Sequence, residues 1–108
     1  VMLTVKGTSP VEGGAGQAHN FLTRDFAPWV GINEDAVTGS AHTVLAPFWR
    51  SVYRENDGGS WTTMYARQCS KRGGDLHLHF DDDKPEQVYI GGGARIVLQG
   101  TMDLSAGN

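Results

Sequence analysis

Cysteine is almost absent from this chain of 108 residues, since Cys69 is the only one. One thiol forms neither a disulfide within the chain nor a multi-cysteine zinc site. We expect it to be half-buried in a strand, and it suits a reducing compartment, so we predict a cytoplasmic protein. No apolar run approaches the roughly 20 residues of a membrane-spanning helix. Positive charge is also scarce, with a net charge of -3, which argues against nucleic acid or an anionic membrane as a partner.

The first residues lack the basic region and apolar core of a signal peptide. The chain begins with Val1 rather than Met, and the weak alternation of Met2–Lys6 predicts a strand there. We therefore expect a fragment, a cleaved product or a chain without its N-terminal part. A length of 108 residues predicts a single domain over 1–108 with one modest hydrophobic core.

The distribution of apolar residues predicts an α+β domain with a central helix. Thr38 is a good N-cap residue, and the helix should end before the run 56–59 (Asn-Asp-Gly-Gly). Pro47 lies within this helix, and we expect a kink or a break into two pieces there. The helix carries an apolar stripe so wide that we expect sheet to enclose it. The stripe consists of Ala41, Val44, Leu45, Phe48, Trp49 and Val52.

Strands are expected on both sides of the helix, because short segments alternate apolar and polar residues between Gly-rich turns. Leu76, Leu78 and Phe80 should face the core, so that His77 and His79 face solvent. The segment 27–37 is expected to be a loop. The expected strands are 2–6, 19–26, 61–69, 76–80, 87–90 and 94–104, the last of them apolar on both faces at 96–98.

The start of the helix is the main candidate site. Such a terminus has unbonded N–H groups and the positive end of the helix dipole, so a carboxylate or phosphate is its natural ligand. Asp35 lies just before it and could accept or donate a proton. On spacing alone, however, helix capping explains Asp35 and Ser40 as well as a binding role does.

Other clusters are weaker candidates. His77 and His79 share a strand face but have no third metal ligand at a suitable spacing, and Asp81–Asp83 lacks the pattern of a calcium loop. Ser40 and His42 point to different sides of a helix, so they are not expected to form a nucleophile–base pair. The glycine runs 73–74 and 91–93 precede no helix, and we interpret them as bends between strands.

Several separated segments resemble the PhzF-like family of phenazine biosynthesis. In chain order they are 24–28 (RDFAP), 31–35 (GINED), 37–42 (VTGSAH), 45–49 (LAPFW), 68–74 (QCSKRGG) and 88–94 (VYIGGGA). Trp29 and the QCS run are most similar to animal members, some of which are known as MAWD-binding-protein-like. Ala36 departs from the family pattern, which usually has Pro at this position.

The resemblance implies the diaminopimelate epimerase-like fold, in which two similar halves each wrap a curved, mostly antiparallel sheet around one central helix. It further implies a cofactor-independent isomerase without a metal, which moves a proton on a small amino-carboxylate in the cleft between the halves. The main catalytic Glu belongs to the N-terminal half, which is absent here. The resemblance makes Asp35 an auxiliary catalytic residue. It places Asp35, Thr38, Gly39, Ser40 and Ala41 at the substrate.

Three hypotheses follow. The chain is the C-terminal half of such an isomerase, whose partners are a small carboxylate substrate and the N-terminal half of the same fold. Alternatively, it is a non-catalytic protein-binding module for a WD-repeat partner. The third hypothesis is a half-length protein that rebuilds the two-half cleft as a homodimer, because an isolated half would expose apolar surface.

Overall fold

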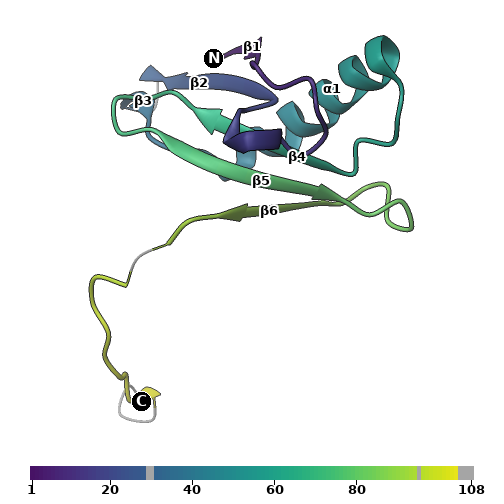
Figure 1. Ribbon diagram of the computed structural model, residues 1–108. Coiled ribbons are helices and arrows are strands. Elements are labelled where there is room, and N and C mark those ends of the chain that lie inside the picture. The colour runs from purple at the N-terminus through teal and green to yellow at the C-terminus, as the bar shows by residue number, and fades with distance from the viewer. Residues whose placement is uncertain (29–30, 95, 105–108) are drawn as a thin grey trace.

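The computed structural model describes residues 1–28, 31–94 and 96–104. Strands precede and follow one long helix, which confirms the predicted α+β class (Figure 1). The elements are β1 (Met2–Lys6), a short 3-10 turn η1 (Ala15–Gln17), β2 (Phe21–Ala27), β3 (Ile32–Asp35), α1 (Gly39–Asp57), β4 (Thr63–Gln68), β5 (Gly74–Phe80) and β6 (Val88–Gly92).

The strands form one sheet in the order β1-β2-β4-β5-β6, and β3 pairs with β2 outside this path. β2 and β4 are parallel, whereas the other neighbouring strands are antiparallel. Parallel neighbours need a long crossover connection, and α1 forms part of the one between β2 and β4. The sheet is thus mostly antiparallel, as predicted, and α1 lies across one of its faces (Figure 1).

The hydrophobic core fills the space between α1 and this face of the sheet. Alternate side chains of β4 and β5 point into it, while His77 and His79 are exposed as the alternation predicts. Aromatic rings dominate the helix side: Trp49 stacks on Phe21 at 5.8 Å, and Tyr53 stacks on Trp61 at 4.3 Å. The buried hydrophobic residues are Phe21, Ala41, Leu45, Ala46, Trp49, Tyr53, Trp61, Met64, Ala66, Leu76, Leu78 and Phe80.

The prediction at Pro47 is a kink or a break into two pieces. α1 is continuous from Gly39 to Asp57, so the break is wrong. A proline inside a helix costs about 3 kcal/mol. Burial of a large apolar side chain contributes about 1.5–3 kcal/mol, and Leu45 and Trp49, on the two sides of the proline, are both buried in the same core. This shared packing offsets the cost of the proline and holds the two parts of the helix together.

The predicted loop 27–37 contains a strand that the sequence analysis missed. β3 pairs with β2 in a register that places Asp35 opposite Asp25, and Arg24 and Glu34 form a bidentate ion pair across the two strands at 2.7 and 2.8 Å. The segment 32–35 is short and polar, so only this pairing reveals a strand. β3 carries Asp35 to the start of α1. Trp29, noted above for the resemblance, lies outside the described residues.

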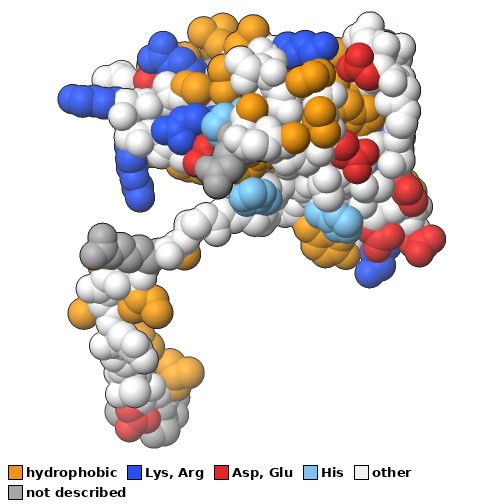
Figure 2. All heavy atoms as spheres, viewed as in Figure 1, with side chains coloured by type: hydrophobic (Ala, Val, Ile, Leu, Met, Phe, Trp, Pro, Cys, Tyr) orange, Lys and Arg blue, Asp and Glu red, His pale blue; other side chains and the backbone are white. Residues whose placement is uncertain are grey.

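The predicted strand 94–104 is also wrong, because its described residues form no strand and leave the sheet beyond β6 (Figure 1). Ile96, Val97 and Leu98 are 79%, 88% and 90% exposed. Figure 2 shows hydrophobic side chains along this projecting segment. Apolar residues alone do not make a strand; a neighbouring strand must supply the hydrogen bonds, and the described residues offer none beyond β6.

The sheet covers only part of the helix. Val44 and Phe48, which belong to the predicted apolar stripe, are 58% and 53% exposed. One face of α1 is therefore open among the residues that the structure describes. Within the same residues, no helix has the length and apolar character that crossing a membrane requires.

Candidate functional site

The turn between β3 and α1 is built around the carboxylate of Asp35. One of its oxygens accepts a hydrogen bond from the N–H of Ala36 at 2.9 Å, and the other accepts one from the Thr38 hydroxyl at 2.5 Å. Thr38 is the N-cap residue, as predicted, and has an extended backbone. Its hydroxyl is oriented toward Asp35, and the helix has no side-chain cap hydrogen bond. The two hydrogen bonds of the Asp35 carboxylate thus come from Ala36 and Thr38, in the turn before the helix, and not from the N–H groups of the first helical turn.

The first N–H groups of α1 are consequently available to a ligand. The N–H groups of Gly39, Ser40 and Ala41 precede the first intrahelical donor, and no side chain caps the helix in their place. Gly39 and Ser40 are exposed, and a side chain added at Gly39 would meet no atom within 4 Å. Ala41 is 8% exposed with its side chain in the core, so only its backbone can contribute to binding.

Gln68, at the end of β4, holds this turn from the interior of the protein. Its side-chain oxygen accepts a hydrogen bond from the Thr38 N–H at 2.6 Å, and its side-chain nitrogen donates to the Asp35 carbonyl and the Thr38 hydroxyl at 3.0 Å each. Gln68 is fully buried. The sequence analysis assigned it no role, although one signal was present: an amide occupies the inward-facing position that follows Met64 and Ala66 on β4.

Two further residues after β4 fix the same turn. The Ser70 hydroxyl donates to the Ala36 carbonyl at 2.8 Å and accepts from the Gly73 N–H at 2.9 Å. Val37 lies so close to Gly74 that a Cβ there would come within 2.1 Å of a Val37 methyl group. The glycine at the start of β5 is therefore required for close packing of the turn. The segment 68–74 supports the helix start rather than forming a phosphate loop.

His42 lies one turn into the helix with its ring fully buried. Its Nδ1 is 2.7 Å from the carbonyl oxygen of Thr38, not paired with Ser40, so the two residues form no nucleophile–base pair, as expected. Burial lowers the pKa of His42, and this effect outweighs the opposing effects of the Thr38 carbonyl and of Asp25. The imidazole is therefore neutral near neutral pH.

A cleft of about 440 Å³ lies beside the start of α1. Val37 and Gly39 form part of its wall, and Arg72 contributes an exposed guanidinium to the same lining. The remaining lining residues belong to the glycine-rich segments 73–76 and 90–93. The cleft gives a small ligand room next to Gly39.

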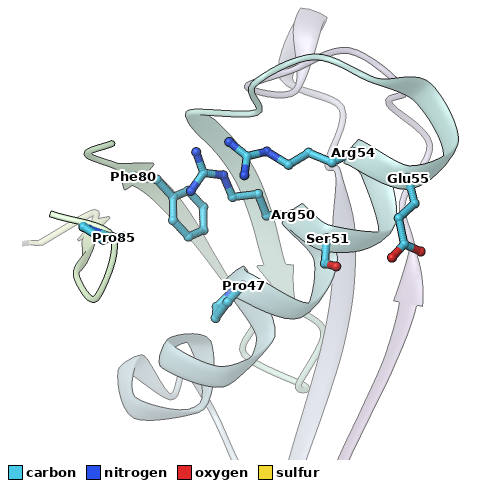
Figure 3. A pocket seen from close by; sticks show the side chains of 7 residues that line it. All are labelled: Pro47, Arg50, Ser51, Arg54, Glu55, Phe80 and Pro85. Atoms are coloured by element: carbon cyan, nitrogen blue, oxygen red, sulfur yellow. The ribbon is translucent and has the colours of Figure 1, made fainter. Parts of the chain in front are cut away.

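A second groove, of about 380 Å³, lies farther along α1 and collects none of the predicted site residues (Figure 3). The Arg50 guanidinium lies over the ring of Phe80, 4.4 Å from its centroid, and bonds to Asp82 at 2.9 Å. Arg54 donates to the Ser60 carbonyl at 2.9 Å, and Glu55 is the acidic residue of the lining (Figure 3). Its arginines already have partners, so this groove is not the candidate anion site.

The other clusters from the sequence do not form sites among the described residues. No group of three or more His, Cys, Asp or Glu side chains there could hold a metal ion. His77 stacks on Tyr65 at 4.5 Å and is exposed, and Asp82 is engaged by Arg50. Cys69 is half-buried directly after β4, close to its expected position.

Known proteins are similar to this chain in both sequence and fold. A phenazine biosynthesis-like domain-containing protein from Mus musculus is 48% identical over 102 residues, which are 94% of this chain and 32% of the mouse protein. An isomerase of uncharacterised function from Halalkalibacterium halodurans is 36% identical over the same shares of both chains. The crystal structure of a PhzC/PhzF protein from Clostridium difficile matches with a TM-score of 0.64 at 32% identity, over 95% of this chain and 33% of that one.

These similarities define the class of protein: an α+β chain with the diaminopimelate epimerase-like fold. The sequence profile described as "Phenazine biosynthesis-like protein" matches residues 4–100, so the chain belongs to this PhzC/PhzF family, as the resemblance predicted. It spans about a third of the length of the relatives it matches, at 32% of the mouse protein.

Proposed function

We propose that this chain supplies the carboxylate-binding helix start of a cofactor-independent, PhzF-like isomerase that transfers a proton on a small amino-carboxylate. One observation carries the proposal: the uncapped start of α1, with Gly39 and Ser40 exposed beside a fixed Asp35 carboxylate. Membership in the family and a bacterial relative named as an isomerase support the reaction class.

In this proposal the substrate carboxylate binds the N–H groups of Gly39 and Ser40. A hydrogen bond to a charged group contributes about 1.5–3 kcal/mol, and the helix dipole adds about 0.3–1 kcal/mol for an anion at this end. The same N–H groups would stabilise enolate-like charge that develops during proton transfer. The hydroxyl of the exposed Ser40 is an additional donor at this position.

Asp35 faces a different part of the substrate. Two carboxylates side by side repel each other, so Asp35 does not bind the substrate carboxylate. Each of its oxygens already accepts one hydrogen bond and keeps a further lone pair for a ligand. Asp35 therefore orients the substrate amino group or assists proton transfer. An amino group and a carboxylate on one small molecule match these two neighbouring positions.

Turnover requires a second acid/base group, which the family resemblance assigns to a Glu in the N-terminal half. The chain alone then binds the substrate weakly and catalyses nothing. We place the complete protein in the cytoplasm, with this N-terminal half as its first partner.

Proton exchange tests the proposal. A dihydro-hydroxyanthranilate-type substrate is incubated in D₂O with the 108-residue chain and with the same chain joined to an N-terminal half. Exchange should appear only with both halves, and the double variant Asp35→Asn, Ser40→Ala should abolish it. The matched control is Asp83→Asn, Ser51→Ala, which makes the same changes at exposed positions outside the site. Exchange by the chain alone, or full exchange by the double variant, would contradict the proposal.

The open face of α1 favours a second candidate, a protein-binding module for a WD-repeat partner or for a second copy of the chain. Val44 and Phe48 are more than half exposed there. Under this alternative, changes at Asp35 and Ser40 leave partner binding intact, whereas Val44→Ser, Phe48→Ser weakens it. Sedimentation of the chain and titration with a purified WD-repeat protein measure the two kinds of association.

A further inference from the structure

The side chain of His42 donates a hydrogen bond to the backbone at the start of its own helix. Nδ1 lies 2.7 Å from the Thr38 carbonyl oxygen, and a carbonyl oxygen can only accept, so Nδ1 carries the proton. Nε2 is then the unprotonated nitrogen. Nε2 is buried and, among the described residues, has no hydrogen-bond partner. The ring is held in place by its stack on Phe21, with centroids 5.8 Å apart.

This contact acts on a group that the ligand is proposed to touch. The carbonyl of Thr38 and the N–H of Gly39 belong to the same planar peptide unit, and in a trans peptide they point in opposite directions. Anchoring the carbonyl oxygen therefore fixes the direction of the Gly39 N–H. Because Thr38 is the N-cap residue, its carbonyl also accepts the first intrahelical bond, from the backbone N–H of His42. One residue thus holds this carbonyl by two N–H groups.

The surroundings leave the imidazole no competing arrangement. With the proton on Nε2, a buried N–H donor would lack an acceptor. The lone pair of Nδ1 would also face a lone pair of the Thr38 carbonyl oxygen, and the two would repel each other. Together these effects cost more than one unpaired acceptor. Burial also lowers the pKa of His42 and opposes the doubly protonated form. The tautomer with the proton on Nδ1 is therefore fixed by the fold.

We propose that His42 is a positioning residue for substrate binding: its Nδ1–H holds the Thr38–Gly39 peptide so that the Gly39 N–H points at the carboxylate of an amino-carboxylate ligand. This inference rests on the proposed function for its ligand. The tautomer and the peptide orientation exist without substrate, so they can be measured on the free protein.

The test compares the wild-type chain with His42→Asn and His42→Leu. Asn places an N–H donor at the position of Nδ1, whereas Leu fills the space without a donor. Binding of anthranilate, a stable aromatic amino-carboxylate, is followed by NMR through the amide resonances of Gly39 and Ser40. We expect His42→Leu to bind anthranilate about tenfold more weakly and His42→Asn to bind within about threefold of wild type. Anthranilamide, which lacks the carboxylate, should bind all three chains weakly and equally.

A measurement without ligand keeps the inference testable on its own. The ¹⁵N resonances of the imidazole in the wild-type chain should identify the Nδ1–H tautomer, and the Gly39 amide resonance should move in His42→Leu but stay near its wild-type position in His42→Asn. An Nε2–H tautomer overturns the inference. A Gly39 amide resonance that stays at its wild-type position in both His42→Leu and His42→Asn also overturns it. Equal anthranilate binding by wild type and a folded His42→Leu also overturns it, while the proposed function stands. If the wild-type Gly39 and Ser40 amides do not respond to anthranilate, the proposed function fails and the positioning role for substrate fails with it.

Discussion

Gln68 and Thr38 are joined by two hydrogen bonds, from the Thr38 N–H to the Gln68 side-chain oxygen at 2.6 Å and from the Gln68 side-chain nitrogen to the Thr38 hydroxyl at 3.0 Å. Through this pair, the end of β4 sets the position of the start of α1. The same hydroxyl donates to Asp35, so one buried amide orients both the helix start and the carboxylate of the proposed site.

Gln68→Leu should destabilise the protein and disorder the turn. The change keeps the approximate volume but leaves the Thr38 N–H and the Asp35 carbonyl without their partner, which costs about 1–3 kcal/mol. Urea unfolding gives the change in the free energy of unfolding, and the amide resonances of residues 36–40 report on the turn. Gln87→Leu is the control at an exposed position and should change neither. Equal stability of the two variants would show that the Gln68 bonds contribute nothing.

Gly74→Ala should be destabilising because of Val37 alone. The new Cβ would lie 2.1 Å from a Val37 methyl carbon, and relief of such overpacking typically costs about 1–3 kcal/mol. Adding Val37→Ala to Gly74→Ala should restore most of the lost stability, as measured by thermal or urea unfolding. Gly92→Ala, whose Cβ would approach no atom closer than 3.8 Å, is the matched control. A double variant no more stable than Gly74→Ala would contradict this packing account.

His42 should make the protein less stable in mild acid. Burial lowers its pKa in the folded state below the unfolded value, which is about 6.5. Below that pH the unfolded chain binds a proton at His42 and the folded chain does not. The contribution of neutral His42 to the free energy of unfolding is therefore fully present above about pH 6.5 and is lost as the pH falls toward the lower pKa of the folded state. One such proton contributes a slope of at most about 1.4 kcal/mol per pH unit.

The measurement is urea unfolding of wild type and His42→Asn at several pH values on both sides of about 6.5. The other three histidines are the same in both proteins, so the difference between the two slopes isolates the contribution of His42. Identical slopes would show that the His42 pKa is the same in the folded and unfolded chains.

Thr38→Val should loosen Asp35 while preserving the shape of the N-cap residue. Valine lacks the hydroxyl that donates to Asp35 and accepts from Gln68, so we expect a loss of about 1 kcal/mol in the free energy of unfolding. Anthranilate affinity should also fall severalfold, because the carboxylate of Asp35 is no longer fixed. Thr38→Ser keeps the hydroxyl and should restore both properties. Weak anthranilate binding by Thr38→Ser would show that the methyl group of Thr38, and not its hydroxyl, is needed for binding.

Local patterns were sufficient to predict the main elements of the fold. The 3.6-residue periodicity and Thr38 located the helix, and the alternation around His77 and His79 predicted the inward and outward faces of β5. These features depend on residues close together in the sequence. The expected enclosure of the helix was only partly realised, because Val44 and Phe48 remain exposed.

The features that were missed depend on partners far away in the sequence. β3 is a polar segment that becomes a strand through its pairing with β2, and the residues around Ile96 have no neighbouring strand in the described chain. Asp35 and Gly39 could be singled out from their motif, but the contacts of Gln68 with Thr38 span 30 residues. No local rule predicts such a contact, although an amide at an inward-facing strand position indicates that a buried polar partner exists.

The central claim is tested most directly by a crystal structure of the chain with anthranilate. The account predicts carboxylate oxygens about 3 Å from the N atoms of Gly39 and Ser40, with the amino group of the ligand toward Asp35. Anthranilate bound elsewhere, for example in the groove of Arg50 and Arg54, with the start of α1 unoccupied, would contradict it.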